Sequence, residues 1–360
     1  MVKEIGSYFN LPFNLFFSKK KIFLSKGLFL STGRDCLEYI IQDLNLSSKD
    51  TVLLPAYLCP SILAPFQKRG INLIFYPVNS TLEVDLPEFN SLVKNCSLAL
   101  IINYFGFSQP KREEIRKICK KQGVFLVEDD VQSFLTKKCF VGDYVFNSLR
   151  KALPLPDGAQ LFTSERINHK SNIIFNNSFY GQIYVATNFL SGILKNIYSF
   201  KFLWRKMFLF SENVLLDKYS KPAPGSLISS FLLNRINFNQ IIEQRRNNYS
   251  YLLSKIKDLS RIKAIYPSLP NNVCPLGLPI LSNQRDKLRS FLIENKIYPP
   301  IHWLLPSETA DFKEAQKISK MTLTLPIDQR YSFKDLDRIV SILYEFELEN
   351  KPSFNTENES

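Results

Sequence analysis

The sequence contains few of the residues on which several kinds of protein depend. Its 360 residues include two histidines, 12 glycines and six cysteines, and no two cysteines form a Cys-x-x-Cys pair. This scarcity argues against a metal centre built from histidines and against a scaffold held together by disulfides. No run of about 18 uncharged apolar residues occurs, so no transmembrane helix is expected.

The N-terminal residues do not have the order of a secretory signal. Residues 9–18 are largely apolar, but the lysines at 19–21 follow them instead of preceding them, and no small-residue cleavage site is present. We therefore expect a cytoplasmic protein.

The composition indicates a globular protein with a basic surface. Hydrophobic residues make up 45% and charged residues 22% of the chain, and the formal net charge is +13. At roughly 100–200 residues per domain, the length predicts two domains, or one large α/β unit with an appendage. The positive charge suits nucleic acid, an anionic membrane surface or a phosphorylated substrate. Because the basic residues are scattered and match no nucleic-acid motif, no nucleic-acid partner is expected.

The first half of the chain alternates short apolar runs with helical patterns. The apolar runs are residues 28–30, 52–54, 73–76, 98–102 and 124–127. Apolar residues recur at helical spacing in 34–44 and 111–121. Buried strands separated by single helices predict a parallel sheet that is covered on both faces. Ligands of such sheets bind at the carboxyl ends of the strands.

The second half of the chain has a different pattern. Pro222, Pro224 and Gly225 mark a break, after which a long helix through residues 245–256 is expected. The remaining elements predict a smaller α+β unit, with strands near 262–266 and 277–281 and helices near 284–295 and 333–348.

Residues 165–220 lie between these halves and interrupt the alternation. Within them, residues 189–210 combine large apolar side chains with four basic residues, which are Lys195, Lys201, Arg205 and Lys206. The pattern is typical of an amphipathic helix at a membrane surface. A helix that packs on its own domain or on a partner subunit shows the same pattern. Both interpretations stay open, and peripheral membrane contact through 189–210 is one of them.

Four short segments, most of them at the ends of expected strands, offer interactions that a bound small molecule needs. Thr32, Gly33 and Arg34 at a helix N-terminus can bind an anion, although such residues often only cap a helix. The acids at 128–130 need a cation opposite them if they are buried. Lys151 can attack an aldehyde once it is desolvated. An aromatic residue in 54–60 can stack on a planar ligand or pack in the core.

In this order, the segments resemble the motifs of the DegT/StrS family of sugar aminotransferases, which are pyridoxal-phosphate (PLP) enzymes of fold type I. The matching residues are Thr32-Gly33-Arg34, Pro55-Ala56-Tyr57-Leu58-Cys59, Asn103-Tyr104-Phe105-Gly106, Glu128-Asp129-x-x-Gln132 and Ser148 to Lys151. Arg245-Arg246, Trp303 and residues 323–327 extend a looser match over the C-terminal half, so that the resemblance covers residues 27–345.

The resemblance implies an α/β fold, with a large PLP-binding domain around a mainly parallel sheet and a smaller C-terminal α+β domain. We expect the large domain at residues 1–240, including an N-terminal arm and the insertion-like helical segment at 165–220. The small domain is expected at 241–350 and a disordered tail at 351–360. The resemblance also implies a homodimer, and the scarcity of histidine predicts no metal.

The resemblance also implies roles for individual residues. Lys151 would bind PLP covalently and move the proton during transamination, and Asp129 would pair with the pyridine nitrogen. The residues that would hold the cofactor are Gly33, Arg34 and Ser148 at the phosphate, Gln132 at the ring hydroxyl, and Tyr57 or Cys59 over one ring face. The sequence leaves the choice between Tyr57 and Cys59 open.

Three features depart from the family pattern. Only two residues separate Ser148 from Lys151, Arg34 replaces a small hydroxyl residue, and the family's Gly-Glu-Gly-Gly appears as residues 156–159, Pro-Asp-Gly-Ala. Lys137 and Lys138 are rivals of Lys151. They precede the Gly-Asp-Tyr segment at 142–144, however, which should come before the cofactor lysine. No histidine lies near 151, which disfavours the dehydratase branch of the family.

The resemblance therefore predicts a PLP-dependent aminotransferase. It would transfer an amino group, with glutamate as the usual donor, to a nucleotide-linked keto-sugar in surface-polysaccharide or related biosynthesis. The alternative is a catalytically altered fold-type-I relative that acts as a membrane-surface scaffold or regulatory partner. The sequence does not name the sugar, the aminated carbon or the pathway.

Overall fold

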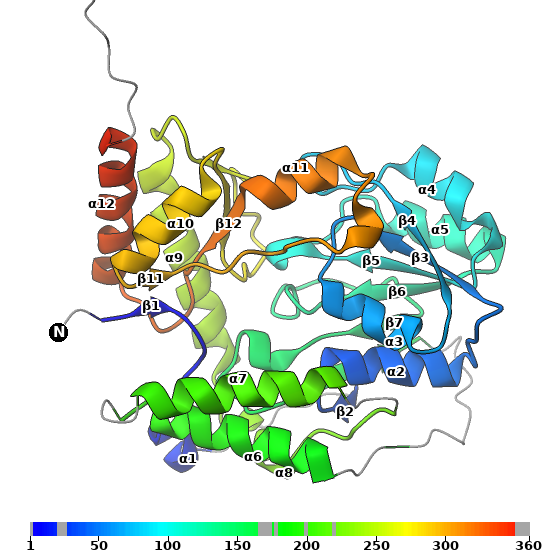
Figure 1. Ribbon diagram of the computed structural model, residues 1–360, viewed down its shortest axis with the longest axis horizontal. Coiled ribbons are helices and arrows are strands. Elements are labelled where there is room, and N and C mark those ends of the chain that lie inside the picture. The colour runs from blue at the N-terminus through cyan, green and yellow to red at the C-terminus, as the bar shows by residue number, and fades with distance from the viewer. Residues whose placement is uncertain are drawn as a thin grey trace, which may run out of the picture.

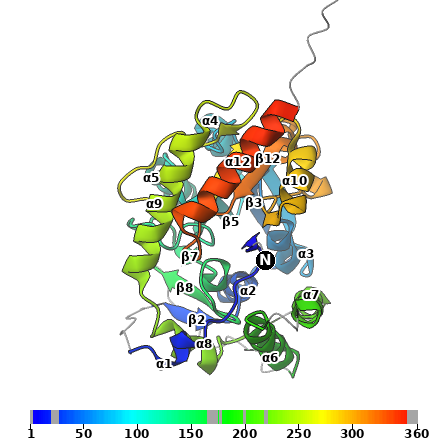
Figure 2. The ribbon, with the colours of Figure 1, turned by 90° about the vertical axis from the view of Figure 1, so that its left-hand side faces the viewer.

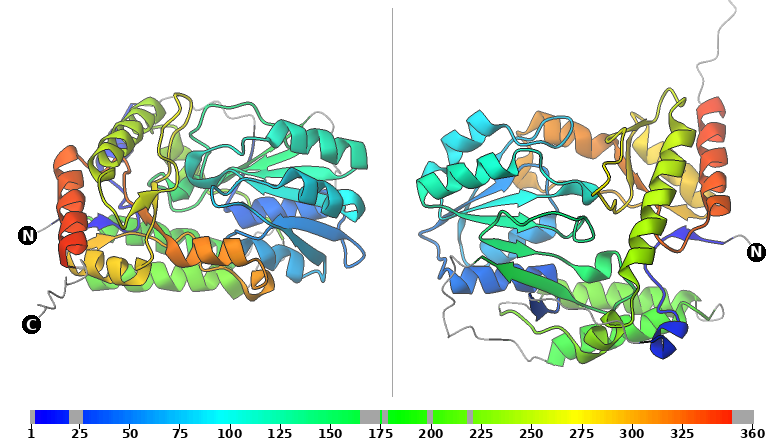
Figure 3. Two further views of the ribbon diagram at one scale, coloured as in Figure 1. Left: turned by 90° about the horizontal axis from the view of Figure 1, so that it is seen from above. Right: turned by 180° about the vertical axis from the view of Figure 1, so that it is seen from behind.

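A large and a small unit make up the computed structural model, which describes residues 3–19, 27–164, 175, 179–197, 201–217 and 221–349. In Figure 1 the large unit lies on the right and the small unit on the left. Figure 3 shows the same arrangement from above and from behind. The tail that was expected to be disordered, 351–360, lies outside the described residues.

The large unit is built on a seven-stranded sheet with the order β2-β8-β7-β6-β5-β3-β4. Neighbouring strands from β7 to β4 are parallel, whereas β8 is antiparallel to both β7 and β2. The strands are β2 (Leu28–Leu30), β3 (Thr51–Pro55), β4 (Asn72–Tyr76), β5 (Leu98–Ile102), β6 (Phe125–Asp129), β7 (Tyr144–Phe146) and β8 (Ala159–Thr163). The mainly parallel sheet expected from the apolar runs is confirmed.

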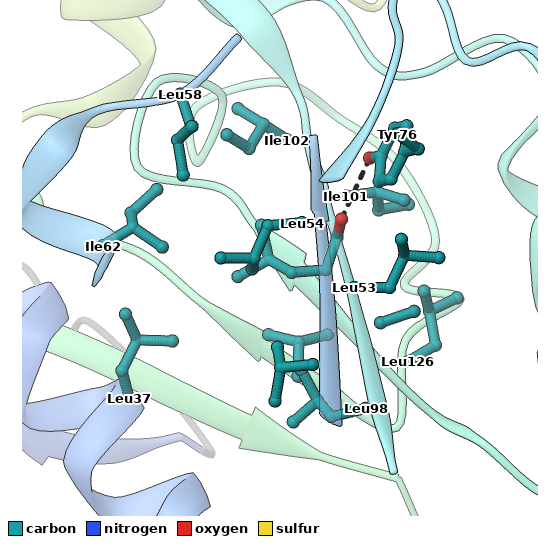
Figure 4. Close-up of a cluster of buried hydrophobic side chains, with 14 of the residues drawn as sticks. Leu37, Leu53, Leu54, Leu58, Ile62, Tyr76, Leu98, Ile101, Ile102 and Leu126 are labelled. Atoms are coloured by element: carbon teal, nitrogen blue, oxygen red, sulfur yellow. Dashed lines mark hydrogen bonds between the residues drawn. The ribbon is translucent and has the colours of Figure 1, made fainter. Parts of the chain in front are cut away.

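Helices cover both faces of this sheet, which explains why its central strands are largely apolar. Helix α2 (Gly33–Asp43) lies below the sheet in Figure 1, and α4 (Leu86–Leu92) and α5 (Arg112–Gln122) lie above it. Figure 4 shows the core on the two sides of β3, with Leu37, Leu54 and Ile62 on one side and Tyr76, Ile101 and Leu126 on the other. The Tyr76 hydroxyl donates a hydrogen bond of 2.9 Å to the Leu100 carbonyl, as the dashed line marks.

The small unit packs three helices around a short antiparallel sheet. Its three strands have the order β12-β10-β9. The elements are α9 (Phe238–Ile256), β9 (Lys263–Ala264), β10 (Leu278–Leu281), α10 (Arg285–Glu294), β11 (Ile297–Tyr298), β12 (Thr322–Leu325) and α12 (Phe333–Glu349). Figure 2 shows α9 and α12 running along this unit. The helices α9, α10 and α12 and the strands β9 and β10 lie where the sequence pattern placed them, within a few residues, whereas β11 and β12 were not predicted.

Two segments connect the units. Near the N-terminus, β1 (Ile5–Gly6) pairs in parallel with β11 of the small unit. Helix α11 (Lys313–Met321) belongs to the second half of the chain, yet it places Ala315 and Ile318 in the core of the large sheet. The division of the chain into domains near residue 240 stays a prediction.

The expectation of one helix across residues 189–210 is wrong. The structure has two helices there, α6 (Phe179–Leu194) and α7 (Lys201–Asp217), which pack side by side at the lower edge of Figure 1. One side of each helix packs against the other helix. At this contact the Ser211 hydroxyl of α7 donates a hydrogen bond of 2.7 Å to the Asn188 side chain of α6. One straight helix could not bury both faces. None of the helices within the described ranges has the length and hydropathy needed to cross a bilayer.

Candidate active site

A cavity of about 260 Å³ lies at the carboxyl ends of the parallel strands. Seven of the eight site residues expected from the sequence line it, namely Gly33, Arg34, Cys59, Asp129, Gln132, Ser148 and Lys151. The small unit closes the cavity with Leu276, His302 and Trp303. The sheet therefore brings together side chains that lie more than a hundred residues apart in the sequence.

The N-terminus of α2 forms one end of the cavity. Thr32 caps this helix: its hydroxyl accepts from the Asp35 N–H at 3.3 Å and donates to the Asp35 carboxyl at 2.5 Å. Gly33 and Arg34 follow in the first turn and line the cavity. Free N–H groups at a helix N-terminus, beside a guanidinium group, are a binding site for an anion.

Asp35 is buried beneath this helix end. Burial raises its pKa to about 7, although hydrogen bonds from Thr32 and from the Ala223 N–H, the latter at 2.9 Å, oppose the rise. Asp35 therefore fixes the cap and does not reach the cavity wall.

The three acids at the end of β6 point in different directions because side chains alternate along a strand. Glu128 accepts from the Gly142 N–H at 2.6 Å and lies 3.5 Å from the Arg112 guanidinium. Asp130 forms an ion pair of 2.8 Å with the buried Lys138. Asp129 points the other way and lines the cavity. Of the Glu-Asp-Asp run, one carboxyl is thus available to a ligand.

The charge of Asp129 is disfavoured in the protein alone. Burial and the neighbouring Asp130 raise its pKa to about 7, against the effect of the Val131 N–H, which donates at 2.8 Å, and of the Lys151 charge. A cationic group in the cavity would favour the ionised carboxylate. Asp129 is therefore suited to pair with a protonated ring nitrogen.

Gln132 is oriented by the turn that follows β5. The Phe105 N–H donates to the Gln132 Oε1 at 2.7 Å, so the Nε2 group of Gln132 is the end left to donate into the cavity. Phe105 has a left-handed φ of 54°, which the turn requires. Gly106 beside it has a φ of 105°, and a Cβ there would lie 2.4 Å from the Cys274 carbonyl oxygen. The aromatic-Gly turn therefore positions Gln132.

Lys151 lies at the end of a short 3-10 helix, 149–151, that begins after Ser148. The Lys151 N–H donates to the Ser148 carbonyl at 3.1 Å, and the adjacent Leu149 is fully buried. The Lys151 side chain is exposed and lines the cavity. The short Ser148–Lys151 spacing thus corresponds to one helical turn, and both residues face the same cavity.

The small unit fixes the backbone next to Lys151. The Ala152 carbonyl accepts from the Gln329 Nε2 at 2.9 Å and from the Arg245 guanidinium at 3.3 Å. Arg245 is fully buried, and it also donates to the Leu276 carbonyl at 2.9 Å and to the Gln329 Oε1 at 3.0 Å. The first of the two arginines at 245–246 therefore supports the site without lining it.

The rival lysines are not at this site. Lys138 is 3% exposed and is held by Asp130 and by the Ser133 hydroxyl at 3.0 Å. Lys137 lines a different cavity, together with Phe134. Neither belongs to the lining of the cavity that contains Asp129.

Tyr57 and Cys59 occupy different positions. Cys59 lines the cavity, whereas Tyr57 is fully buried behind the wall. The Tyr57 hydroxyl donates to the His302 carbonyl, and its ring lies 5.7 Å from that of Trp303 and 5.6 Å from that of Tyr104. Of the two residues, Cys59 is the one that can contact a ligand.

Sequence reasoning did not assign His302 to the site. Its Nδ1 lies 2.9 Å from the Thr324 hydroxyl, and burial together with the Lys151 charge lowers its pKa to about 3. A neutral imidazole therefore lines the cavity. The available signal was its place next to Trp303, two residues after the pair of prolines at 299–300.

Comparison with known proteins shows which solved structures share this fold. No protein-family model matches the sequence, and no curated protein is similar to it in sequence. Solved structures do match: a DegT DnrJ EryC1 StrS aminotransferase from Brucella abortus has 17% identity and a TM-score of 0.65, with 90% of this chain and 86% of that chain covered. PseC from Helicobacter pylori, an aminotransferase in the biosynthesis of pseudoaminic acid, has 13% identity and a TM-score of 0.66, with 91% and 88% covered.

A third matching structure is described as a cofactor-bound form. The putative sugar aminotransferase Spr1654 from Streptococcus pneumoniae, in its PMP form, has 15% identity and a TM-score of 0.66, with 90% of this chain and 88% of that chain covered. These comparisons define the class of fold, which is that of the PLP-dependent aminotransferases of fold type I. The particular fold is that of the DegT/StrS-type sugar aminotransferases, as the sequence motifs indicated. At these identities the likeness defines the fold and not the reaction.

Proposed function

We propose that this protein is a PLP-dependent aminotransferase that acts on a nucleotide-linked keto-sugar. The observation that carries the proposal is that Lys151 and Asp129 line one cavity, together with the N-terminus of α2. An amine, an acid and an anion site are the three groups that a pyridine aldehyde phosphate needs.

The donors of the cavity fit PLP at each of its polar positions. The anion site at Gly33 and Arg34 suits the phosphate, and Ser148 can add its hydroxyl. The Gln132 Nε2 can donate to the ring hydroxyl, because its Oε1 is held by the Phe105 N–H. Cys59 lies where it can cover a ring face.

The chemistry that PLP supplies when bound is an electron sink for the pair left on a substrate carbon after proton removal. Lys151 would bind the aldehyde and afterwards move the proton with its amine. Asp129 would be ionised opposite the ring nitrogen, because a cation at short range lowers its raised pKa. His302, buried and neutral, would shape the cavity without adding a second positive charge beside Lys151.

A sugar substrate is supported by the names of the matching structures, which include sugar aminotransferases, and by a structure of DesI with a TDP-sugar product. The net charge of +13 suits a diphosphate group. Five further points stay predictions. They are glutamate as the amino donor, a role in surface-polysaccharide or related biosynthesis, a homodimer, a cytoplasmic location and peripheral membrane contact through 189–210. The alternative of a non-catalytic scaffold has no support among the described residues, because lysine, acid and anion site share one cavity.

The proposal is tested by spectroscopy and then by an assay. Addition of PLP to the purified protein should produce a visible absorption band that glutamate removes. Lys151→Ala should abolish the band, and Lys137→Ala, outside the cavity, should leave it unchanged. A panel of nucleotide-linked keto-sugars would then identify the acceptor. A protein that takes up no PLP would contradict the proposal.

A further inference from the structure

Helices α6 and α7 form a hairpin whose outer side is not used by the candidate active site. Figures 1 and 2 show the two helices side by side at the lower edge of the molecule. Their inner sides are packed: Tyr184 and Trp204 are buried, and Lys195 lies 4.7 Å from the centre of the Trp204 ring. The opposite side of α7 is open to solvent in the monomer.

The outer side of α7 consists of large apolar and basic residues. We call it the α7 face, and its members are Phe202, Leu203, Arg205, Lys206, Leu209 and Phe210. All six are exposed, and the exposed fractions of Phe202, Leu209 and Phe210 are 72%, 56% and 54%. Their spacing of three and four residues places them on one side of the helix. Lys206 lies 4.3 Å from the centre of the Phe202 ring, so its charge sits among the apolar side chains.

The charged side chains of the α7 face are both basic. Residues 166–211 contain six lysines and arginines and neither aspartate nor glutamate. Two of these basic residues, Arg205 and Lys206, are exposed on the α7 face. An occupant of the α7 face must therefore be apolar in part and negatively charged.

We propose that the α7 face binds the surface of an anionic phospholipid bilayer. Basic residues mixed with Phe and Leu on one side of a helix are the features of helices that lie in the membrane interface. The lipid phosphates would meet Arg205 and Lys206, while Phe202, Leu209 and Phe210 would enter the boundary of the acyl chains.

A second copy of this chain fits the face less well. A two-fold symmetric contact would place the same face on both subunits, so that the basic residues of one copy would oppose those of the other. The α7 face itself contains no acid that could neutralise them. The lipid surface supplies the opposite charge, whereas a second α7 face does not.

Vesicle co-sedimentation of the full-length protein tests the proposal. Wild type should sediment with vesicles that mix phosphatidylcholine and phosphatidylglycerol, should remain in solution with phosphatidylcholine alone, and should be released by salt. The double variant Arg205→Gln/Lys206→Gln should reduce the partition coefficient about 30-fold, from two charges near the lipid surface. The variant Phe202→Ser/Phe210→Ser should also reduce it. Lys151→Ala should sediment as wild type does, because the face acts without the cofactor.

Two control variants make the same kinds of substitution at exposed residues outside the α7 face. Lys120→Gln/Lys121→Gln changes two exposed lysines of α5, and Leu348→Ser changes an exposed leucine of α12. Both should sediment as wild type does, and the thermal midpoint of each variant reports whether it is folded. The proposal is overturned if wild type ignores anionic vesicles or if folded α7-face variants still bind. It is equally overturned if those variants change only the oligomeric state on a sizing column.

Discussion

Asp129 carries an energetic cost that a ligand can remove. Its carboxyl is buried next to Asp130, and its pKa is raised to about 7 although the Lys151 charge opposes the rise. Without a cation in the cavity, the ionised form is disfavoured at neutral pH. A ring cation opposite Asp129 would restore its charge, and the same group would then orient the ring.

This cost predicts a pH dependence of stability. The folded pKa of Asp129 lies above its ordinary value of 3.8, so the neutral carboxyl stabilises the fold at low pH and this contribution is lost as the pH rises to about 7. Between about pH 5 and about pH 8 the loss should be about 3 kcal/mol in the PLP-free protein. Denaturant unfolding of wild type and Asp129→Asn at both pH values measures it. Parallel pH profiles for the two proteins would contradict this assignment.

Tyr57→Phe tests which residue of the 54–60 segment meets the ligand. The variant loses the hydrogen bond to the His302 carbonyl, which is then left unpaired behind the cavity wall. We expect the free energy of unfolding to fall by about 1–2 kcal/mol. PLP uptake, measured by absorbance titration, should stay unchanged because Tyr57 does not line the cavity. A loss of PLP affinity with unchanged stability would place the Tyr57 ring against the ligand instead.

At the residue scale, the order of the motifs along the chain was predictable from the sequence, but the directions of their side chains were not. The spacing of residues 128–132 predicted an acid at the sheet edge, and strand alternation places Asp129 there. The choice between Tyr57 and Cys59 depends on how the chain turns between β3 and the 3-10 helix at 60–62, which no local pattern encodes. His302 reaches the cavity only because the small unit folds over the large sheet.

At the element scale, Asp157 organises the start of α8 (Leu227–Leu233). Its carboxyl accepts from the Ser226 N–H at 3.0 Å, from the Ser226 hydroxyl at 2.5 Å and from the Ser229 hydroxyl. Burial raises the Asp157 pKa, and these bonds oppose the rise. Asp157, which aligns with the glutamate of the family's Gly-Glu-Gly-Gly motif, therefore stabilises the N-terminus of α8 in this chain.

Asp157→Ala should destabilise the protein and loosen the support of Lys151. Three hydrogen bonds to a buried carboxyl are lost, so the free energy of unfolding should fall by about 2–4 kcal/mol. Leu232 and Leu233 of α8 pack in one cluster with Leu149, so PLP affinity should fall as well. Denaturant unfolding and PLP titration measure the two effects. An Asp157→Ala protein as stable as wild type would show that α8 does not depend on this carboxyl.

Element positions were predictable where a single local rule applied. The apolar runs are strands that helices cover on both faces, and α5 ends at Gln122, directly before Gly123, whose φ of 74° suits glycine. The 189–210 segment was predicted as one helix because large apolar and basic residues are mixed along its whole length. Which residues of the segment pack against a second helix is a tertiary property that the residue pattern does not show.

At the scale of the whole molecule, Arg245 joins the small unit to the lysine segment. It is buried on α9 and donates to the carbonyls of Leu276 and Ala152, next to Lys151. Burial lowers its pKa, but the guanidinium keeps its proton at physiological pH. The relative position of the two units and the position of Lys151 therefore depend on the same side chain.

Arg245→Met should reduce both stability and PLP affinity. Several buried carbonyls lose their donor, so the free energy of unfolding should fall by about 3 kcal/mol or more. Arg246→Met is the matched control, because Arg246 donates to the carbonyls of Pro270 and Val273 and does not reach Ala152. Its effect on PLP titration should be small. Equal losses of affinity in the two variants would contradict a special link through Arg245.

The attachment point of the cofactor tests the account most directly. After incubation with PLP and reduction with borohydride, peptide mapping by mass spectrometry should find the pyridoxyl group on Lys151. Asp129→Asn should weaken PLP binding without moving the label. Labelling of Lys138 or of scattered surface lysines, with none on Lys151, would contradict the account.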